Sequence, residues 1–178
     1  MSGDERLERA TAALLALAGE RRWSEISLRD VAERAELPLP DLYDLADGKA
    51  ALLAHLSARF DRAALETAAT PNSDVHDRLF DATMARLEVM GPDRAALIAI
   101  ARGGGAAIAL HLPRTARAIL EAAGVEATAP RLAAMTAVWA RTVQVWRDDE
   151  GALNRTMAEI DKRLKQMRRR LGAIGAGF

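Results

Sequence analysis

The chain has 178 residues with 25 basic and 25 acidic side chains, and this balance excludes a uniformly basic protein that coats nucleic acid. Half of the residues are apolar, 28% are charged and none is cysteine, which excludes a disordered chain, a disulfide framework and thiolate chemistry. No apolar run reaches the roughly 18 residues of a membrane-spanning helix, and the charged N-terminus does not resemble a secretory signal, so we expect a cytoplasmic protein.

The composition favours helices, because alanine supplies 39 of the residues and glycine only 12. We therefore expect an all-α protein. Three short helical patterns within residues 1–48 predict a head, and longer patterns within residues 49–171 predict a larger helical body. The glycine-rich residues 172–178 are expected to form a flexible tail.

The three helices of the head have recognisable boundaries. Ser2 stands three residues before Glu5, and Ser27 stands three residues before Asp30, so each pair predicts a capped helix start. A third, shorter helix fits within residues 38–46, between two prolines and an Asp-Gly pair.

The body begins with a long helix from Lys49, and a second long helix from Ser73 is interrupted at Gly91-Pro92. A later pattern runs to Gly124, with a break expected near Pro113. The last two helices are the most regular, and the final one spaces its apolar residues alternately by four and three, as a heptad seam does.

The sequence offers little support for catalysis. His55, His76 and His111 lie far apart and do not have the spacing of metal ligands. The acidic residues 148–150 lack the pattern of a calcium loop, and the glycines at 103–105 lack the Lys-Ser/Thr pair of a phosphate loop. We expect no enzyme activity, no metal and no cofactor.

A capped helix, a tight connection and a short helix that ends in Leu-Tyr are arranged as in a helix-turn-helix. Over about fifty residues the stretch ISLRDVAERAELPLPDLYDLADGKAALLAHL resembles the TetR family of transcriptional regulators. The matching positions are Ile26, Val31, Ala32, Ala35, Leu37, Leu42, Tyr43, Lys49 and Leu52. The resemblance implies that Ser27, Tyr43 and Lys49 contact the DNA backbone.

Several positions of the head depart from that family's pattern. Glu36 replaces the usual turn glycine, and Pro38 replaces a small capping residue. Basic or small residues expected to face the groove are replaced by Leu39, Pro40, Asp41 and Asp44, and Ala46 stands where an aromatic residue is usual.

The charges of the head oppose DNA binding. Residues 36–47 contain four acids and no base, and residues 1–62 have a net charge of −3. Carboxylates in a DNA groove are unfavourable unless they accept hydrogen bonds from cytosine amines. The DNA-binding candidates are Ser27, Arg29, Asp41, Tyr43 and Lys49. The alternative is a helix-turn-helix kept as a scaffold after DNA reading was lost.

A second resemblance supports that alternative. The stretches VHDRLFDATMARLEVMGPDRAALIAIAR and VWARTVQVWRDDEGALNRTMAEIDKRL resemble bacterial relatives of a lipid-binding accessory protein of coenzyme Q biosynthesis, which has the TetR fold. This resemblance implies a pocket for an isoprenoid lipid and no DNA reading. It also implies that the C-terminal helix, with six bases in residues 162–170, contacts an anionic membrane. The other interpretation of that helix is a dimer helix with a solvated basic face.

Two sets of body residues follow from the apolar patterns. The ligand-binding candidates are Met84, Leu87, Met90, Trp139 and Trp146, although such stripes are also ordinary core. The dimerisation candidates are Trp139, Val143, Met157, Ile160, Leu164 and Met167, because the heptad spacing suits a four-helix interface.

The leading hypothesis is a homodimeric TetR-like regulator in which a small hydrophobic ligand binds the body and changes operator binding by the head. The alternative is a lipid-binding or isoprenoid-binding accessory protein of the same fold that has lost DNA binding.

Overall fold

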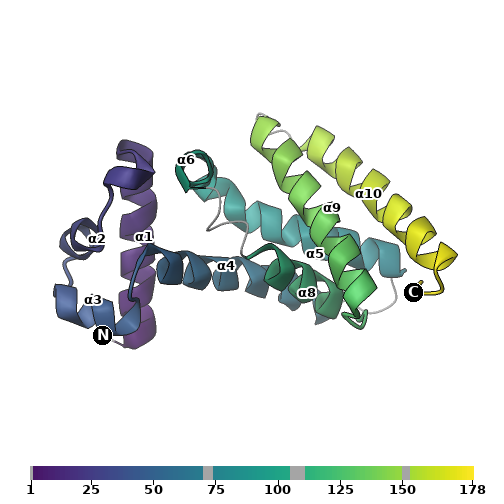
Figure 1. The fold of residues 1–178 in the computed structure, drawn as a ribbon, viewed down its shortest axis with the longest axis horizontal. Coiled ribbons are helices and arrows are strands. Elements are labelled where there is room, and N and C mark those ends of the chain that lie inside the picture. The colour runs from purple at the N-terminus through teal and green to yellow at the C-terminus, as the bar shows by residue number, and fades with distance from the viewer. Residues whose placement is uncertain (1, 70–73, 105–110, 150–152) are drawn as a thin grey trace. The chain divides into compact units, whose positions relative to one another are not determined.

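The computed structural model describes residues 2–69, 74–104, 111–149 and 153–178, and within them every regular element is a helix (Figure 1). This confirms the all-α prediction. The helices are α1 (Gly3–Glu20), η1 (Trp23–Glu25), α2 (Leu28–Arg34), α3 (Leu39–Leu45), α4 (Lys49–Glu66), η2 (Thr67–Ala69), α5 (Val75–Met90), η3 (Gly91–Asp93), α6 (Arg94–Gly104), α8 (Leu112–Ala122), α9 (Ala129–Asp148) and α10 (Asn154–Ala173).

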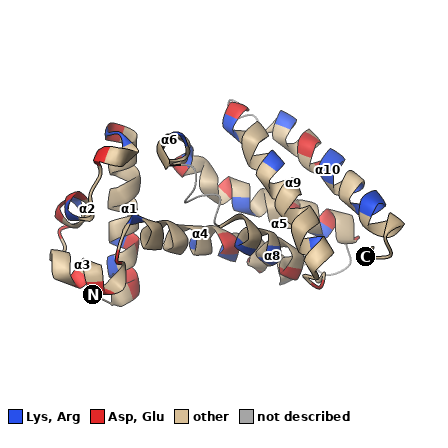
Figure 2. Cartoon of the chain, viewed as in Figure 1, with Lys and Arg blue, Asp and Glu red and all other residues tan. Residues whose placement is uncertain are grey.

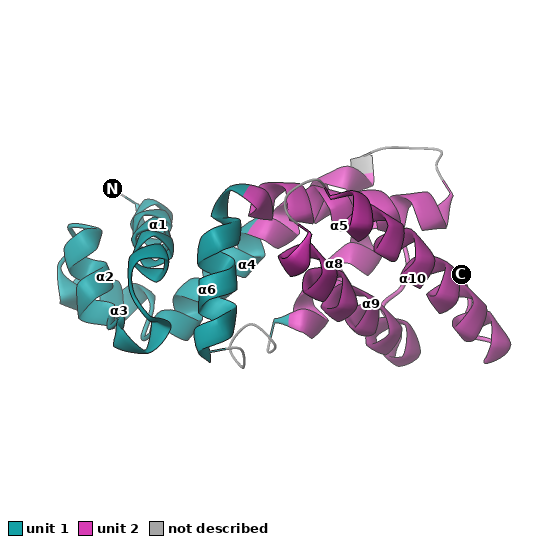
Figure 3. Ribbon diagram, turned by 90° about the horizontal axis from the view of Figure 1, so that it is seen from above, with its two compact units in different colours: residues 1–59, 92–111 teal, residues 60–91, 112–178 magenta. Residues whose placement is uncertain are grey.

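The chain forms two compact units (Figure 3). Unit 1 comprises Met1–Arg59 and Pro92–His111, and unit 2 comprises Phe60–Gly91 and Leu112–Phe178. This division differs from the predicted boundary after residue 48. The first part of α4 belongs to unit 1, and α6 joins unit 1 because it packs against α1 and η1.

The predicted helix starts are confirmed. Ser2 and Glu5 form a capping box at α1, and Ser27 and Asp30 form one at α2. These side chains satisfy backbone N–H groups that have no partner inside the helix. The predicted start at Ser73 lies outside the described residues, and the cap of α5 is Asp74, whose carboxylate accepts from the Val75 N–H.

The core of unit 1 lies where α1 packs against α2, α3 and α6. Leu14 of α1, Val31 of α2, Leu42 of α3 and Ile100 of α6 are all fully buried. Each such side chain contributes about 1.5–3 kcal/mol of hydrophobic stabilisation, so α1 fixes the positions of the two short helices. Neither α2 nor α3 is long enough to be stable alone.

Unit 2 is built on α8 and α10, which both pack against α5 and α9. Its largest fully buried side chains are Leu79, Leu87, Ile119, Leu120, Met135, Ile160 and Leu164. The chain end belongs to this unit as well. Arg131 of α9 donates to the carbonyl oxygens of Ala176 and Gly177 at 3.0 and 2.6 Å, so two residues of the predicted flexible tail 172–178 contact α9.

Candidate functional site

The helix-turn-helix of unit 1 consists of α2, a short connection and α3. Glu36 lies in the connection with φ of 53°, in the left-handed region. This is the position where the TetR pattern has glycine, and the geometry explains that preference because a side chain costs about 1–2 kcal/mol in this conformation.

Replacing Glu36 with glycine is therefore expected to raise the free energy of unfolding by about 1 kcal/mol, measured by urea denaturation. The matched control is Glu33→Gly, because Glu33 is exposed inside α2 with ordinary helical geometry. There glycine should destabilise by about 0.5–1 kcal/mol. Destabilisation by Glu36→Gly would show that the conformation at residue 36 is not strained.

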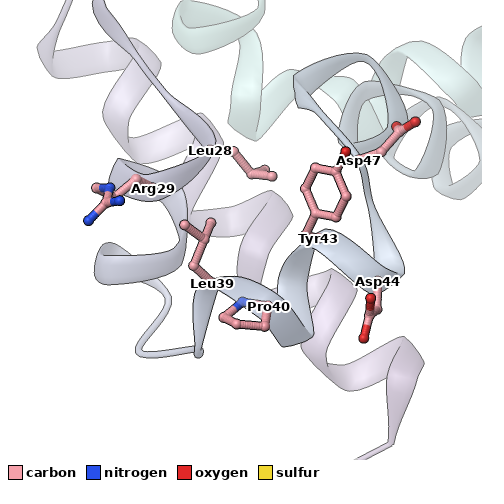
Figure 4. A pocket seen from close by; sticks show the side chains of 7 residues that line it. All are labelled: Leu28, Arg29, Leu39, Pro40, Tyr43, Asp44 and Asp47. Carbon is pink, nitrogen blue, oxygen red and sulfur yellow. The ribbon is translucent and has the colours of Figure 1, made fainter.

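The outer surface of α2 and α3 carries a depression (Figure 4). Its lining residues are Leu28, Arg29, Leu39, Pro40, Tyr43, Asp44 and Asp47. Tyr43 is 59% exposed, which is high for a large aromatic side chain. The surface is thus apolar at its centre, with Arg29 as its one base and with two carboxylates.

Most bases of unit 1 are held by acids or carbonyl oxygens of the same unit, and Figure 2 shows both charges on α1 and α2, whereas α3 carries acids and no base. Arg34 makes two hydrogen bonds to Glu20, at 3.0 and 2.6 Å. Arg9 donates to the Ala35 carbonyl at 2.6 Å. These contacts reduce the positive charge that is available for phosphates.

Two of the DNA-binding candidates are engaged in the same way. Asp41 pairs with Arg6 of α1 at 3.4 Å. Ser27 exchanges hydrogen bonds with Asp30, and these bonds, together with the guanidinium of Arg21, hold the pKa of Asp30 well below its usual range. Ser27 thus caps α2, as its spacing from Asp30 predicted.

Lys49 is also occupied in this structure. Its Nζ donates to the Trp23 carbonyl oxygen at 2.6 Å and lies 4.2 Å from the centre of the Trp23 ring. Burial lowers the pKa of Lys49, which Asp30 partly opposes. The expected phosphate contact of Lys49 requires the ammonium to leave these partners.

Arg29 and Tyr43 are the exposed candidates that have no hydrogen-bond or ion-pair partner among the described residues. Within the described residues of unit 1, Arg29 makes no hydrogen bond or ion pair, and the same holds for Asp44 and Asp47. The net result is one unpaired base beside two unpaired acids on the surface that a DNA-binding helix-turn-helix presents.

The ligand-binding candidates of unit 2 are all buried: Met84, Leu87, Met90, Trp139 and Trp146. Met90 and Trp139 both contact Arg86, which was not among the predicted ligand-binding residues. The Arg86 guanidinium lies 4.8 Å from the Trp139 ring centre, and Nη1 lies 2.8 Å from the Met90 sulfur.

Arg86 is the centre of a buried polar cluster. Nε donates to Asp61 Oδ1 at 2.9 Å, and Nη2 donates to the Thr115 hydroxyl at 3.0 Å, which in turn donates to Asp61 at 3.0 Å. Burial lowers the pKa of Arg86, and Asp61 counteracts that effect. Arg114 lies 3.5 Å from Asp61 Oδ2, an oxygen that otherwise accepts no hydrogen bond.

The position of Arg86 in the sequence is a signal for this cluster. Arg86 stands seven residues after Leu79 and four before Met90, so it falls on the apolar face of α5. A base on such a face predicts a buried acid on a neighbouring helix, but the sequence does not indicate that this acid is Asp61 of α4.

Most residues of the heptad seam are buried within their own chain. Ile160, Leu164 and Met167 are at most 3% exposed because α10 packs against α5 and α9 of its own chain. Trp139 is buried too, whereas Val143 and Met157 are partly exposed. A dimer partner can therefore reach Val143 and Met157, but not the buried seam.

The same burial gives no support to the expected membrane contact of α10. Its apolar stripe faces the core of unit 2, so the helix presents a mainly basic polar face to solvent (Figure 2). Two of those bases have partners: Lys165 pairs with Asp161 at 2.8 Å and Arg168 with Asp74 at 3.3 Å. A helix without a free apolar face does not insert into a lipid surface.

Within the described residues, no three acidic or histidine side chains are grouped as a metal site. No helix in that part of the chain is both long and apolar enough to cross a bilayer.

No protein-family model matches the chain, and no curated protein matches it. Two solved structures are similar to the chain over most of its length. A TetR transcriptional regulator from Nitrosomonas europaea ATCC 19718 is similar with a TM-score of 0.70 and 19% identity, covering 90% of this chain and 96% of that one. A TetR transcriptional regulator from Rhodococcus sp. RHA1 gives 0.66 and 18%, covering 91% and 94%. The chain therefore has the TetR fold.

Proposed function

We propose that this chain, which has the fold of TetR transcriptional regulators, is a cytoplasmic, dimeric regulator that binds operator DNA through unit 1 and a small hydrophobic ligand through unit 2. The observation that carries the proposal is the capped helix-turn-helix, with Tyr43 and Arg29 exposed on its outer surface. The fold of the two similar regulators supports it.

The charges of unit 1 set how strongly DNA would be bound. Arg29 is unpaired in the described part of the chain, and Arg22 is 86% exposed with a weak contact to Glu25 at 4.0 Å. Two phosphate contacts per protomer give a dimer a slope of about −4 when the logarithm of the binding constant is plotted against that of salt concentration. We therefore expect weak, salt-sensitive binding.

The test is a titration of purified protein against labelled DNA from its own upstream region at about 50 mM salt, with a scrambled fragment as control. The proposal predicts a complex that the upstream fragment forms more tightly, and that weakens as salt is added. Equal binding to both fragments, or no binding with or without hydrophobic ligands, would exclude operator recognition.

The proposed ligand site lies around Trp139 and Trp146 in the core of unit 2, together with Met84, Leu87 and Met90. Thioether, aliphatic and indole side chains are suited to a hydrophobic ligand. Binding would change tryptophan emission, because both of these indoles are buried.

One observation favours a second function. The ion pairs of Arg6, Arg21 and Arg34 leave unit 1 with little free positive charge. A ligand-binding accessory protein of the same fold, without DNA reading, would have such a head. Ligand-dependent tryptophan emission in a protein that binds no DNA would favour this second function.

A further inference from the structure

Trp23 holds the only lysine of unit 1 in place. The ammonium of Lys49 donates to the Trp23 carbonyl oxygen at 2.6 Å and lies 4.2 Å from the centre of its ring. A cation over an indole face is attracted by the ring, so the side chain and the backbone of one residue bind the same charge.

Trp23 itself packs closely against the end of α6. A Cβ atom on Gly103 would lie 2.5 Å from Trp23 Cβ, and one on Gly104 would lie 2.5 Å from Trp23 Nε1. Only glycine permits this approach, because real Cβ contacts are not so short. By contrast, a Cβ on Gly19, at the end of α1, would meet nothing within 4 Å.

We propose that Trp23 is a positioning residue that withholds the Lys49 ammonium from DNA phosphate, and that the contact of Trp23 with Gly103 and Gly104 of α6 maintains this state. The inference rests on the DNA-binding function proposed above and adds a control on it. The position of α6 against η1 decides whether the head has one more phosphate-binding charge.

Three features support the withheld state. Lys49 is the first residue of α4, where the TetR resemblance implies a backbone contact, yet its charge is satisfied inside unit 1. The glycine pair lets Trp23 pack closely against the end of α6, and a Cβ at either position would displace it. Releasing Lys49 adds one phosphate contact per protomer, which steepens the salt slope by about 0.9 for each.

The first test does not involve DNA. In the full chain, protons of the Lys49 ε-methylene group next to the indole should show an upfield ring-current shift by NMR, assigned by its loss in Lys49→Arg. Gly103→Ala forces Trp23 to move and should return this signal to the ordinary lysine position. Gly19→Ala is the control and should leave the signal shifted. An unchanged signal in folded Gly103→Ala would overturn the positioning role.

The second test measures DNA affinity. Gly103→Ala should bind upstream DNA more tightly, on the order of tenfold at about 50 mM salt, and with a steeper salt slope. Loss of structure in Gly103→Ala would lower the DNA affinity, so a gain in affinity cannot come from misfolding. Trp23→Phe, which keeps the carbonyl and a smaller ring, should give a smaller gain.

Failure of the withholding role and failure of the proposed DNA-binding function would give different results. Equal DNA affinity of wild type and Gly103→Ala, with the Lys49 signal released, would overturn the withholding role while the DNA function stands. Absence of any complex with every variant would overturn the DNA function and, with it, phosphate as the partner of the released ammonium.

Discussion

Replacing Asp61 with alanine is expected to lower the free energy of unfolding by about 3–5 kcal/mol, because it removes the carboxylate that compensates a buried guanidinium. Asp61 and Arg86 side chains are both 5% exposed and meet at 2.9 Å. The same substitution also removes the acceptor of the Thr115 hydroxyl. Urea denaturation followed by circular dichroism measures the loss.

Two comparisons show whether the charge is responsible. Asp81→Ala removes an exposed carboxylate from α5 and should change stability by less than about 0.5 kcal/mol. The double variant Asp61→Leu with Arg86→Met removes both charges, and it should recover much of the loss, since apolar residues can replace a buried ion pair. A double variant as unstable as Asp61→Ala would contradict the account of an uncompensated charge.

Leu164→Ala is the second large effect, with an expected loss of about 2–5 kcal/mol. Leu164 is 1% exposed inside its own chain, so alanine leaves a cavity in the core of unit 2. The loss should be present at any protein concentration, because the packing partners belong to the same chain.

Melting temperatures measured at several protein concentrations show whether Leu164 packs in the core of its own chain or, as the heptad spacing suggested, against a second protomer. If Leu164 packed against a second protomer, dilution would change the difference in melting temperature between wild type and Leu164→Ala. We expect that difference to stay constant from micromolar to submicromolar protein. Lys165→Ala, an exposed neighbour, is the control and should cost less than about 0.5 kcal/mol.

The local features of the fold could be predicted because they depend on neighbouring residues. Helix caps at Ser2 and Ser27 follow from side chains three residues apart. The periodicity of residues 153–171 identified a helix with one apolar face. What that face contacts depends on the tertiary packing, so the same pattern suited a partner, a membrane or the chain's own core.

The contribution of α6 to unit 1 could not be predicted for a similar reason. Composition and motifs place a head at the N-terminus, but α6 returns to it from residues 94–104 through contacts with α1 and η1. Long-range contacts of this kind have no local signal. No signal in the sequence indicates that Gly103 and Gly104 allow the close packing of Trp23, which lies far from them along the chain.

The charged residue types of the candidate site could be predicted from the sequence, but the ion pairs that its bases form could not. The acidic character of residues 36–47 was readable from the sequence, and the structure adds that Arg6, Arg21 and Arg34 are already bound to acids of the same unit. Arg29 could not be separated from the other bases by sequence alone. Its lack of a partner within the described residues makes it the base on which the proposed DNA binding would most depend.

The most direct test of the central claim compares DNA binding by wild type, Arg29→Ala and Arg34→Ala under one salt titration with the upstream fragment. The account predicts a specific wild-type complex that Arg29→Ala weakens, with a shallower salt slope, while Arg34→Ala changes affinity little because Glu20 already neutralises that base. Specific binding that Arg29→Ala leaves unchanged, or no specific wild-type complex at all, would contradict it.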